Sequence, residues 1–151
     1  MTAIALQSQF PALADYLSDT ARTVGIYGEL YLARLFEAQG HKVSTSHKAG
    51  DLTVVNRDGE IVHIEVKTAR RSKAGTWQFC LYKAKHTNHH NADLVVLLCV
   101  GRAGDLTPFV LPSNKLNAHK ITIYRTPQDY SGIYARYRQS IRSINVFEVS
   151  K

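Results

Sequence analysis

The stretch GDLTVVNRDGEIVHIEVK, residues 50 to 67, decides the fold of this chain of 151 residues. Two runs rich in Val and Ile flank a turn that carries Asp58-Gly59, which is the pattern of a β-hairpin. A strand points successive side chains to opposite faces. We therefore expect Glu65 and Lys67 to share one face, and the apolar side chains to share the other: Val62, Ile64 and Val66.

Asp51 stands at the start of the first of these two strands. An antiparallel partner brings it next to Glu65 and Lys67, in a segment otherwise apolar enough to be buried. Unpaired charge in such a place is costly. Two carboxylates and a lysine at the end of a hairpin are the groups that a magnesium-dependent phosphodiester hydrolase requires.

The spacing of these residues resembles a known signature. Asp51, thirteen residues and then Glu65-Val66-Lys67 resemble the core of the PD-(D/E)XK nuclease superfamily, with Gly50 in place of its proline. A helix carrying Glu29 precedes both strands, and this order resembles Holliday-junction resolvases and homing and restriction endonucleases. The resemblance covers residues 20 to 100. It implies an α/β, restriction-endonuclease-like fold: a mixed β-sheet flanked by helices, with an αβββαβ core.

The resemblance also implies an activity, that of a metal-dependent DNA endonuclease leaving 5′-phosphates. Asp51 and Glu65 would be carboxylate ligands of Mg²⁺, for which Mn²⁺ can substitute, and the Val66 carbonyl a third oxygen. Lys67 would lie near the attacking water and the phosphorus. Glu29 would complete a second metal position or hold a metal-bound water.

Each of these residues also has an ordinary structural interpretation. Glu65 and Lys67 could form an ion pair at a sheet edge, with Asp51 as a turn residue and Glu29 as a solvated helix glutamate. His63 is most simply a hydrogen-bonded strand residue. Other polar or aromatic candidates are better read as exposed loop or core positions: His86, His89 and His90 in a polar loop, and Trp77 in the core.

The charge balance favours a polyanionic partner. The chain carries 19 Lys and Arg against 12 Asp and Glu, a net charge of +7 with a pI near 9.5, so we expect a nucleic-acid partner. The resemblance implies that this partner is DNA. The basic residues nearest the proposed site are the expected phosphate contacts: Lys48, Arg70, Arg71, Lys73, Lys83 and Lys85.

The whole chain predicts one domain over residues 1–151, in the cytoplasm, with no signal or membrane segment. Cys80 and Cys99 are expected to be buried thiols rather than a disulfide or zinc site. An enzyme of this size that cuts both strands is expected to be a homodimer. The alternative is a non-catalytic DNA-binding or assembly protein that retains the nuclease fold.

The remaining pattern predicts the other elements. A helix is expected over 20–39, ended by Gly40, and a short one after Pro11. Strands are expected at 41–46, 51–56, 60–68, 76–82, 93–100, 107–111 and 121–124. A last helix, over 129–141, would interleave tyrosines with Arg136, Arg138 and Arg142. It would clamp DNA, form a dimer contact, or be an ordinary surface helix packed through its tyrosines.

Overall fold

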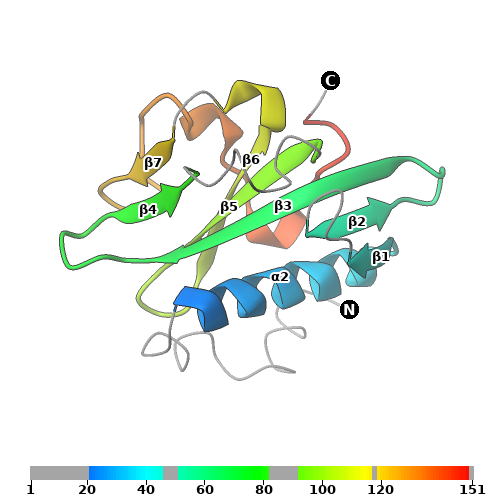
Figure 1. Ribbon diagram of the computed structural model, residues 1–151, viewed down its shortest axis with the longest axis horizontal. Coiled ribbons are helices and arrows are strands. Elements are labelled where there is room, and N and C mark those ends of the chain that lie inside the picture. The colour runs from blue at the N-terminus through cyan, green and yellow to red at the C-terminus, as the bar shows by residue number, and fades with distance from the viewer. Residues whose placement is uncertain (1–20, 46–50, 82–91, 117–118, 150–151) are drawn as a thin grey trace.

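A computed structural model of the chain describes residues 21–45, 51–81, 92–116 and 119–149. Its main sheet is five-stranded and mixed, in the order β1-β2-β3-β5-β6. The pairs β1–β2, β2–β3 and β5–β6 are antiparallel, and β3–β5 is parallel. The strands span Lys42–Thr45 (β1), Leu52–Val55 (β2), Ile61–Arg70 (β3), Leu94–Val100 (β5) and Leu106–Pro112 (β6). The expected α/β fold with a mixed sheet is therefore confirmed (Figure 1).

The β2–β3 hairpin forms in the expected register, with Val54 opposite Val62. The side-chain oxygen of Asn56 accepts hydrogen bonds from the backbone N–H groups of Asp58 (3.0 Å) and Glu60 (2.9 Å). Gly59 supplies the positive φ of 82° that the turn needs. These local bonds fix the loop length, and the loop length fixes which side chains of β3 face the core.

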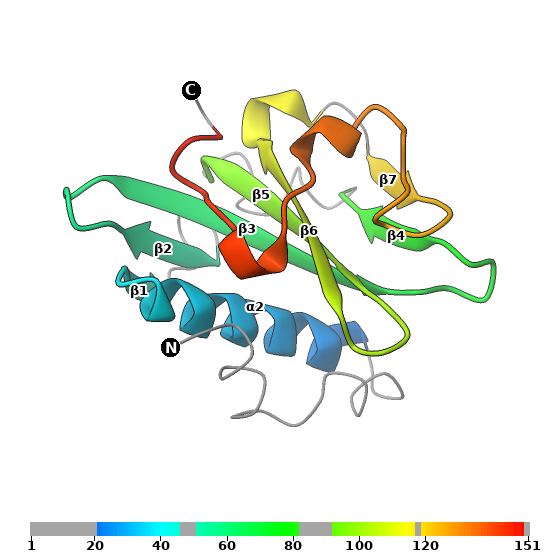
Figure 2. The same cartoon turned by 180° about the vertical axis from the view of Figure 1, so that it is seen from behind.

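Helix α2 (Ala21–Ala38) covers one face of the sheet, as Figures 1 and 2 show. Its buried stripe follows the helical period: Val24, Tyr27, Tyr31, Leu32, Leu35 and Phe36. The stripe packs against Ile64 and Val66 of β3 in one apolar cluster. Gly40 ends the helix at φ 94°, and the His41 N–H bonds back to the Phe36 carbonyl at 3.1 Å. The predicted helix and its end are confirmed.

The opposite face is covered by a second sheet of two strands, β4 (Trp77–Cys80) and β7 (Lys120–Ile123). Side chains from both sheets form a second apolar cluster, which includes Trp77, Phe79, Val95 and Leu97. The expected strand at 121–124 therefore pairs with β4 rather than lying at the edge of the main sheet.

Two expectations are wrong. Residues 129–141 do not form an α-helix: within 129–143 the chain makes two short 3₁₀ turns, η5 (Ala135–Tyr137) and η6 (Ile141–Ser143). A Cβ on Gly132 would overlap the Tyr130 hydroxyl, which means that the Tyr130 side chain folds back over its own segment. This packing of Tyr130 takes the place of a regular helix. Cys80 is exposed rather than buried because it faces away from the second cluster in β4, whereas Cys99 is buried; both are free thiols.

Some expectations fall outside the described residues. The helix after Pro11 and any helix between β4 and β5, within 82–91, belong to this group. A third short 3₁₀ turn, η4 (Ser113–Lys115), follows β6. Within the described ranges, no helix has the length and apolar character needed to cross a membrane.

Candidate functional site

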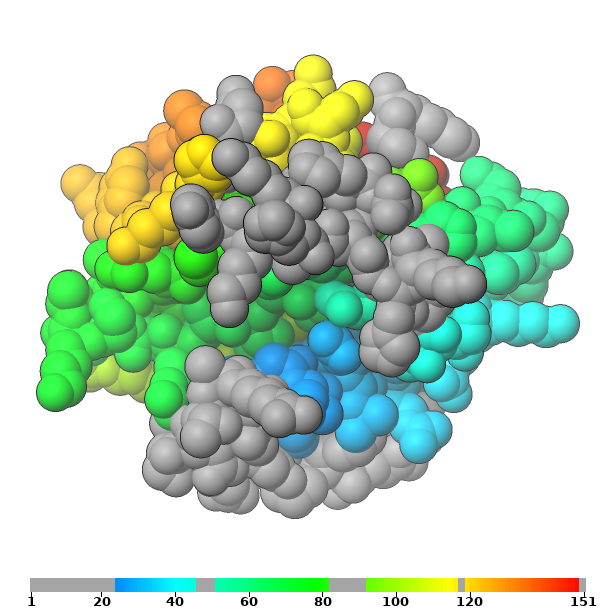
Figure 3. Space-filling model, viewed as in Figure 1, coloured from blue at the N-terminus to red at the C-terminus, as the bar shows by residue number. Residues whose placement is uncertain are grey.

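The candidate site lies where β3 extends beyond the end of its neighbour β2. β2 pairs only with the stretch from Ile61 to Ile64, whereas β3 continues to Arg70 and pairs with β5 along its other side. In the part of the chain that the structure describes, no strand pairs with this edge of β3 beyond Ile64. Figure 1 looks onto this edge, with α2 below it and the β4–β7 pair above, and Figure 3 shows the same face in space-filling form.

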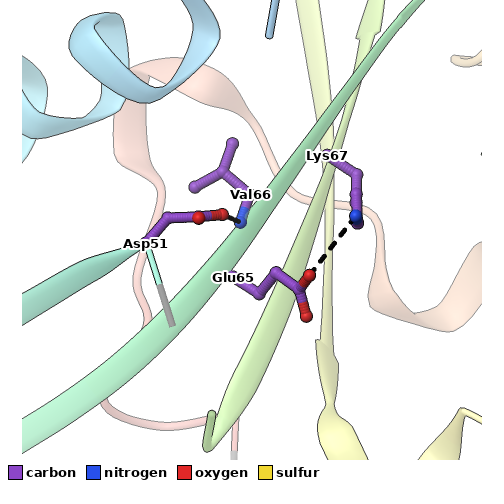
Figure 4. Close-up of polar contacts among 4 residues, drawn as sticks. All are labelled: Asp51, Glu65, Val66 and Lys67. Atoms are coloured by element: carbon purple, nitrogen blue, oxygen red, sulfur yellow. Dashed lines mark hydrogen bonds and ion pairs between the residues drawn. The ribbon is translucent and has the colours of Figure 1, made fainter. Parts of the chain in front are cut away.

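Asp51 takes the place of the missing strand. Its backbone N–H donates to the Ile64 carbonyl at 2.8 Å, and its carboxylate oxygen Oδ2 accepts the Val66 N–H at 2.7 Å (Figure 4). The side chain thus continues the hairpin's hydrogen bonds by one step. A strand residue directs its N–H and its carbonyl to the same neighbour, so the Val66 carbonyl also lies on this edge, next to the Asp51 carboxylate.

Glu65 and Lys67 share the face expected from strand alternation. The Lys67 Nζ lies 3.3 Å from the Glu65 Oε1, and the side chains are 31% and 7% exposed, respectively. Glu65 is buried because its neighbour on β5 is Val95, in the second apolar cluster. The amine of Lys67 is partly open to solvent while its partner is not. Because Glu65 is removed from water, the Coulomb attraction between the two charges is screened less than it would be between two exposed side chains.

Glu29 approaches the same edge from α2. Burial raises the pKa of its carboxyl from 4.5 to about 7; the negative charge of Asp51 acts in the same direction, and the positive charge of Lys67 opposes it. A nearby like charge raises the pKa of a carboxyl, so the contribution from Asp51 indicates that Glu29 lies close to it. Its half-buried position matches the expected place at the edge of the helix stripe.

Close packing of α2 on β3 sets the position of Glu29, and the sequence analysis did not predict this packing. A Cβ built on Gly28 would overlap the Thr68 hydroxyl, so the helix comes within reach of β3 only because this residue is glycine. A glycine inside an otherwise regular helix pattern was the available signal. The partner, Thr68, could be identified only from the fold.

The oxygen donors of the site match the chemistry of a small hard cation. Mg²⁺ is usually held by one or two carboxylates together with waters and substrate phosphates. Asp51 and Glu65 offer two carboxylates, beside the Val66 carbonyl. Among the described residues no group of three or more His, Cys, Asp or Glu side chains has metal-binding geometry. Mg²⁺ demands near-octahedral geometry, so these donors alone would not complete its coordination, and waters or substrate oxygens would have to supply the rest.

The basic residues expected near the site divide into two groups. Arg70 is the last residue of β3, and Arg71 and Lys73 are exposed in the turn that follows. Lys48, Lys83 and Lys85 lie outside the described residues, as do His86, His89 and His90.

The ordinary interpretations hold for two residues. The His63 ring Nδ1 and the Thr53 hydroxyl are hydrogen-bonded at 3.0 Å across the hairpin, which accounts for this histidine without a role in the site. Trp77 is buried in the second cluster, and its indole N–H donates to the Val100 carbonyl at 2.8 Å.

Comparison with solved structures finds a similar fold in a bacterial homing endonuclease, I-Ssp6803I. The TM-score is 0.62, the sequences are 14% identical, and the match covers 79% of this chain and 88% of the other. No family model and no curated protein sequence matches the chain. At 14% identity, the likeness concerns the fold.

Proposed function

We propose that this protein is a metal-dependent DNA endonuclease of the PD-(D/E)XK type, with its centre at the open edge of β3. The observation that carries the proposal is the convergence of Asp51, Glu65 and Lys67 on that edge, through the 2.7 Å and 3.3 Å contacts described above. The fold shared with a homing endonuclease supports it. The net charge of +7 supports a DNA partner.

The two carboxylates would hold Mg²⁺ or Mn²⁺, with the Val66 carbonyl as a third ligand. A bound cation supplies Lewis-acid stabilisation of the charge that grows on the phosphate. The Asp51 carboxylate keeps one oxygen on the Val66 N–H, so its other oxygen is oriented and available. Glu65 is fixed by burial and by Lys67. The protein thus pre-organises the ligands before any substrate arrives.

Lys67 would act on the scissile phosphate directly. Its ammonium group, partly exposed beside Glu65, can donate hydrogen bonds to a non-bridging oxygen and to the attacking water. Glu29 would hold a second water or cation from the helix side. The expected product carries a 5′-phosphate and a 3′-hydroxyl. Cutting both strands would require two such centres, which a C2 homodimer presents to antiparallel strands.

The alternative, a binding or assembly protein with the same fold, predicts an incomplete site. Asp51, Glu65 and Lys67 are all present and in contact with site neighbours, which favours catalysis. The structural neighbour is a homing endonuclease, so site-specific cutting is the first mode to test and junction resolution the second.

The test is cleavage of supercoiled plasmid and of a synthetic four-way junction, in Mg²⁺ or EDTA, by the wild type, Lys67→Ala and Lys42→Ala. Lys42 is exposed on β1 and provides a control with the same loss of charge. We expect Mg²⁺-dependent cutting that Lys67→Ala abolishes and Lys42→Ala retains. Cutting that survives in Lys67→Ala would contradict the proposal, and so would salt-sensitive binding with no cutting on a library of random sites.

A further inference from the structure

A groove lined by arginines lies at the far end of β3 from the hairpin. It has a volume of about 580 Å³ and is formed by three segments: the β3–β4 turn, the β5–β6 turn and the residues after β7. Both ribbon views place these segments together at one end of the molecule, on the left in Figure 1 and on the right in Figure 2. The residues that matter here are Arg71, Arg102, Arg125, Asp105 and Gln128.

Three arginines line this groove, and among the described residues none of them forms an ion pair with a carboxylate: Arg71, Arg102 and Arg125. One carboxylate, that of Asp105, also lines it. That carboxylate lies against Gly101 and accepts a hydrogen bond of 3.5 Å from Gln128, which also donates to the Thr107 hydroxyl at 2.8 Å. The groove therefore keeps an excess of positive charge.

The backbone at Arg125 departs from ordinary geometry. Its φ is 64°, and among the described residues it is the one non-glycine with a positive φ. Such a conformation persists where the surrounding structure imposes it, and it is found more often at ligand-binding positions. Here it places an arginine, rather than the glycine that would fit more easily, beside Thr126 and Pro127 at the wall of the groove.

Strand β3 connects this groove with the candidate site. From Lys67 to the last residue of the strand, Arg70, the chain rises about 10 Å at 3.3 Å per residue, which matches about three base pairs along a DNA strand. Trp77, which lines the groove, belongs to the second apolar cluster, on the side of the sheet that Glu65 and Lys67 face. A backbone that meets Lys67 can therefore continue into the groove without crossing the sheet.

We propose that Arg71, Arg102 and Arg125 form a phosphate-binding groove that holds the DNA backbone about three base pairs from the point of cleavage. Guanidinium groups bind phosphate oxygens in pairs of parallel hydrogen bonds, and the groove is open to solvent. The inference rests on the proposed function for its ligand. Its contacts position the DNA and carry no base preference.

The experiment measures binding of a short duplex of arbitrary sequence in EDTA, by fluorescence anisotropy, over 50 to 200 mM salt. The variant is Arg71→Ala/Arg102→Ala/Arg125→Gly. Glycine at 125 keeps the positive φ, so a loss of affinity there reports the charge and not the backbone. Lys42→Ala is the control for loss of a positive charge elsewhere, since Lys42 is exposed on β1 and does not line the groove. Thermal unfolding verifies that each variant is folded.

Each phosphate contact adds about 0.9 to the slope of log K against log salt. We expect the triple variant to lose about 2.7 from this slope, so that its affinity falls about 40-fold less than that of the wild type across the fourfold salt range. Lys42→Ala should lose far less of the slope than the triple variant. Arg102→Lys should keep the slope, and Arg102→Glu should weaken binding further than alanine.

Equal slopes for the wild type and the triple variant would overturn the groove while leaving DNA binding by the protein intact. No binding by the wild type would overturn the DNA partner, and the groove with it. If the salt slopes differ as expected but the wild type does not cut DNA in Mg²⁺, the groove is supported and the proposed catalysis is contradicted.

Discussion

At the scale of single residues, the two carboxylate oxygens of Asp51 have separate roles. One oxygen accepts the hydrogen bond of the Val66 N–H in β3, and the other is the one that the proposed cation site would use. The shared face of Glu65 and the position of Lys67 beside it follow from strand alternation. The same alternation allowed both to be predicted from the sequence.

Asp51→Asn and Asp51→Ala separate these two roles. Asparagine keeps an oxygen that accepts the Val66 N–H, so its unfolding free energy should stay near that of the wild type, while activity is lost with the charge. Alanine leaves the N–H without its acceptor and should cost a further 1–3 kcal/mol, roughly, in urea unfolding. Equal unfolding free energies of the two variants would show that the hydrogen bond to the Val66 N–H does not stabilise the folded protein.

Glu29 predicts a pH dependence of stability. Its pKa is about 7 in the folded state against 4.5 for the free side chain, chiefly from burial and then from Asp51. The folded chain thus binds a proton more tightly than the unfolded chain does. The stabilisation is complete below pH 4.5, and it is lost as the pH rises to 7.

In EDTA, the unfolding free energy of the wild type should therefore fall between pH 5 and pH 8 relative to that of Glu29→Gln. Urea unfolding at both values measures this difference. The trend should shrink in Mg²⁺, because a cation at the site favours the ionised carboxylate. The same slope in the wild type and in Glu29→Gln would contradict the assigned position of Glu29.

The clustering of the three groove arginines could not be predicted from the sequence. Arg71 was expected near DNA because it follows Lys67 closely. Arg102 and Arg125 lie in turns after β5 and β7, and no local pattern brings them to Arg71. Their proximity arises from the pairing of β3 with β5 and from the packing of the second sheet.

At the scale of elements, the approach of α2 to β3 decides whether Glu29 reaches the site. Gly28 and Thr68 are in such close contact that a side chain at 28 has no room. Gly25, one helical turn earlier, has no heavy atom within 4 Å of its Cβ position. The two glycines therefore offer a matched pair of substitutions on one helix.

Gly28→Ala should destabilise the protein by about 1–3 kcal/mol through overpacking, and it should reduce cleavage because Glu29 moves with the helix. Gly25→Ala should stabilise it by about 0.5–1 kcal/mol, because alanine is the better helix former. Thermal unfolding and a cleavage assay measure both effects.

Gly28→Ala/Thr68→Ala is the rescue variant. It removes the hydroxyl that the new Cβ would meet, and this hydroxyl forms no hydrogen bond with a described residue. Stability and activity should both recover in part. No recovery would mean that Gly28 matters for a reason other than room against β3.

The segment at 129–141 shows why element prediction failed there. Its tyrosines and arginines recur at spacings that fit a helix, yet those side chains are used otherwise. Arg138 donates to the carbonyls of Pro127 (3.0 Å) and Tyr130 (2.8 Å), and Tyr130 and Tyr134 are buried in the second cluster. Tertiary packing overrode the local pattern, whereas in α2 and the β2–β3 hairpin both levels agree.

At the scale of the whole molecule, the main sheet separates two apolar clusters, and the site lies at an edge where both faces meet. Glu29 arrives from the α2 side, and Glu65 and Lys67 from the side of the second sheet. The sequence predicted the sheet and its flanking helix, but not the second sheet, because the β4–β7 pairing joins strands far apart in the chain.

The two cysteines report on this architecture. Cys80 is exposed on β4, and Cys99 is buried in the second cluster, where burial raises the pKa of its thiol. A thiol reagent should modify one cysteine per native chain quickly, and the second only at the rate at which the core opens. Cys80→Ser should remove the fast phase. Rapid reaction of both thiols would contradict the closed second layer.

The central claim is that the carboxylates of Asp51 and Glu65 form a divalent-cation site at the open edge of β3. Titration of Mn²⁺ into the protein at pH 8, followed by the EPR signal of free Mn²⁺, tests it most directly. We predict saturable binding in the wild type that weakens at least about tenfold in Asp51→Asn and in Glu65→Gln, with Lys42→Ala unchanged. Identical Mn²⁺ binding by the wild type and both carboxylate variants would contradict the account.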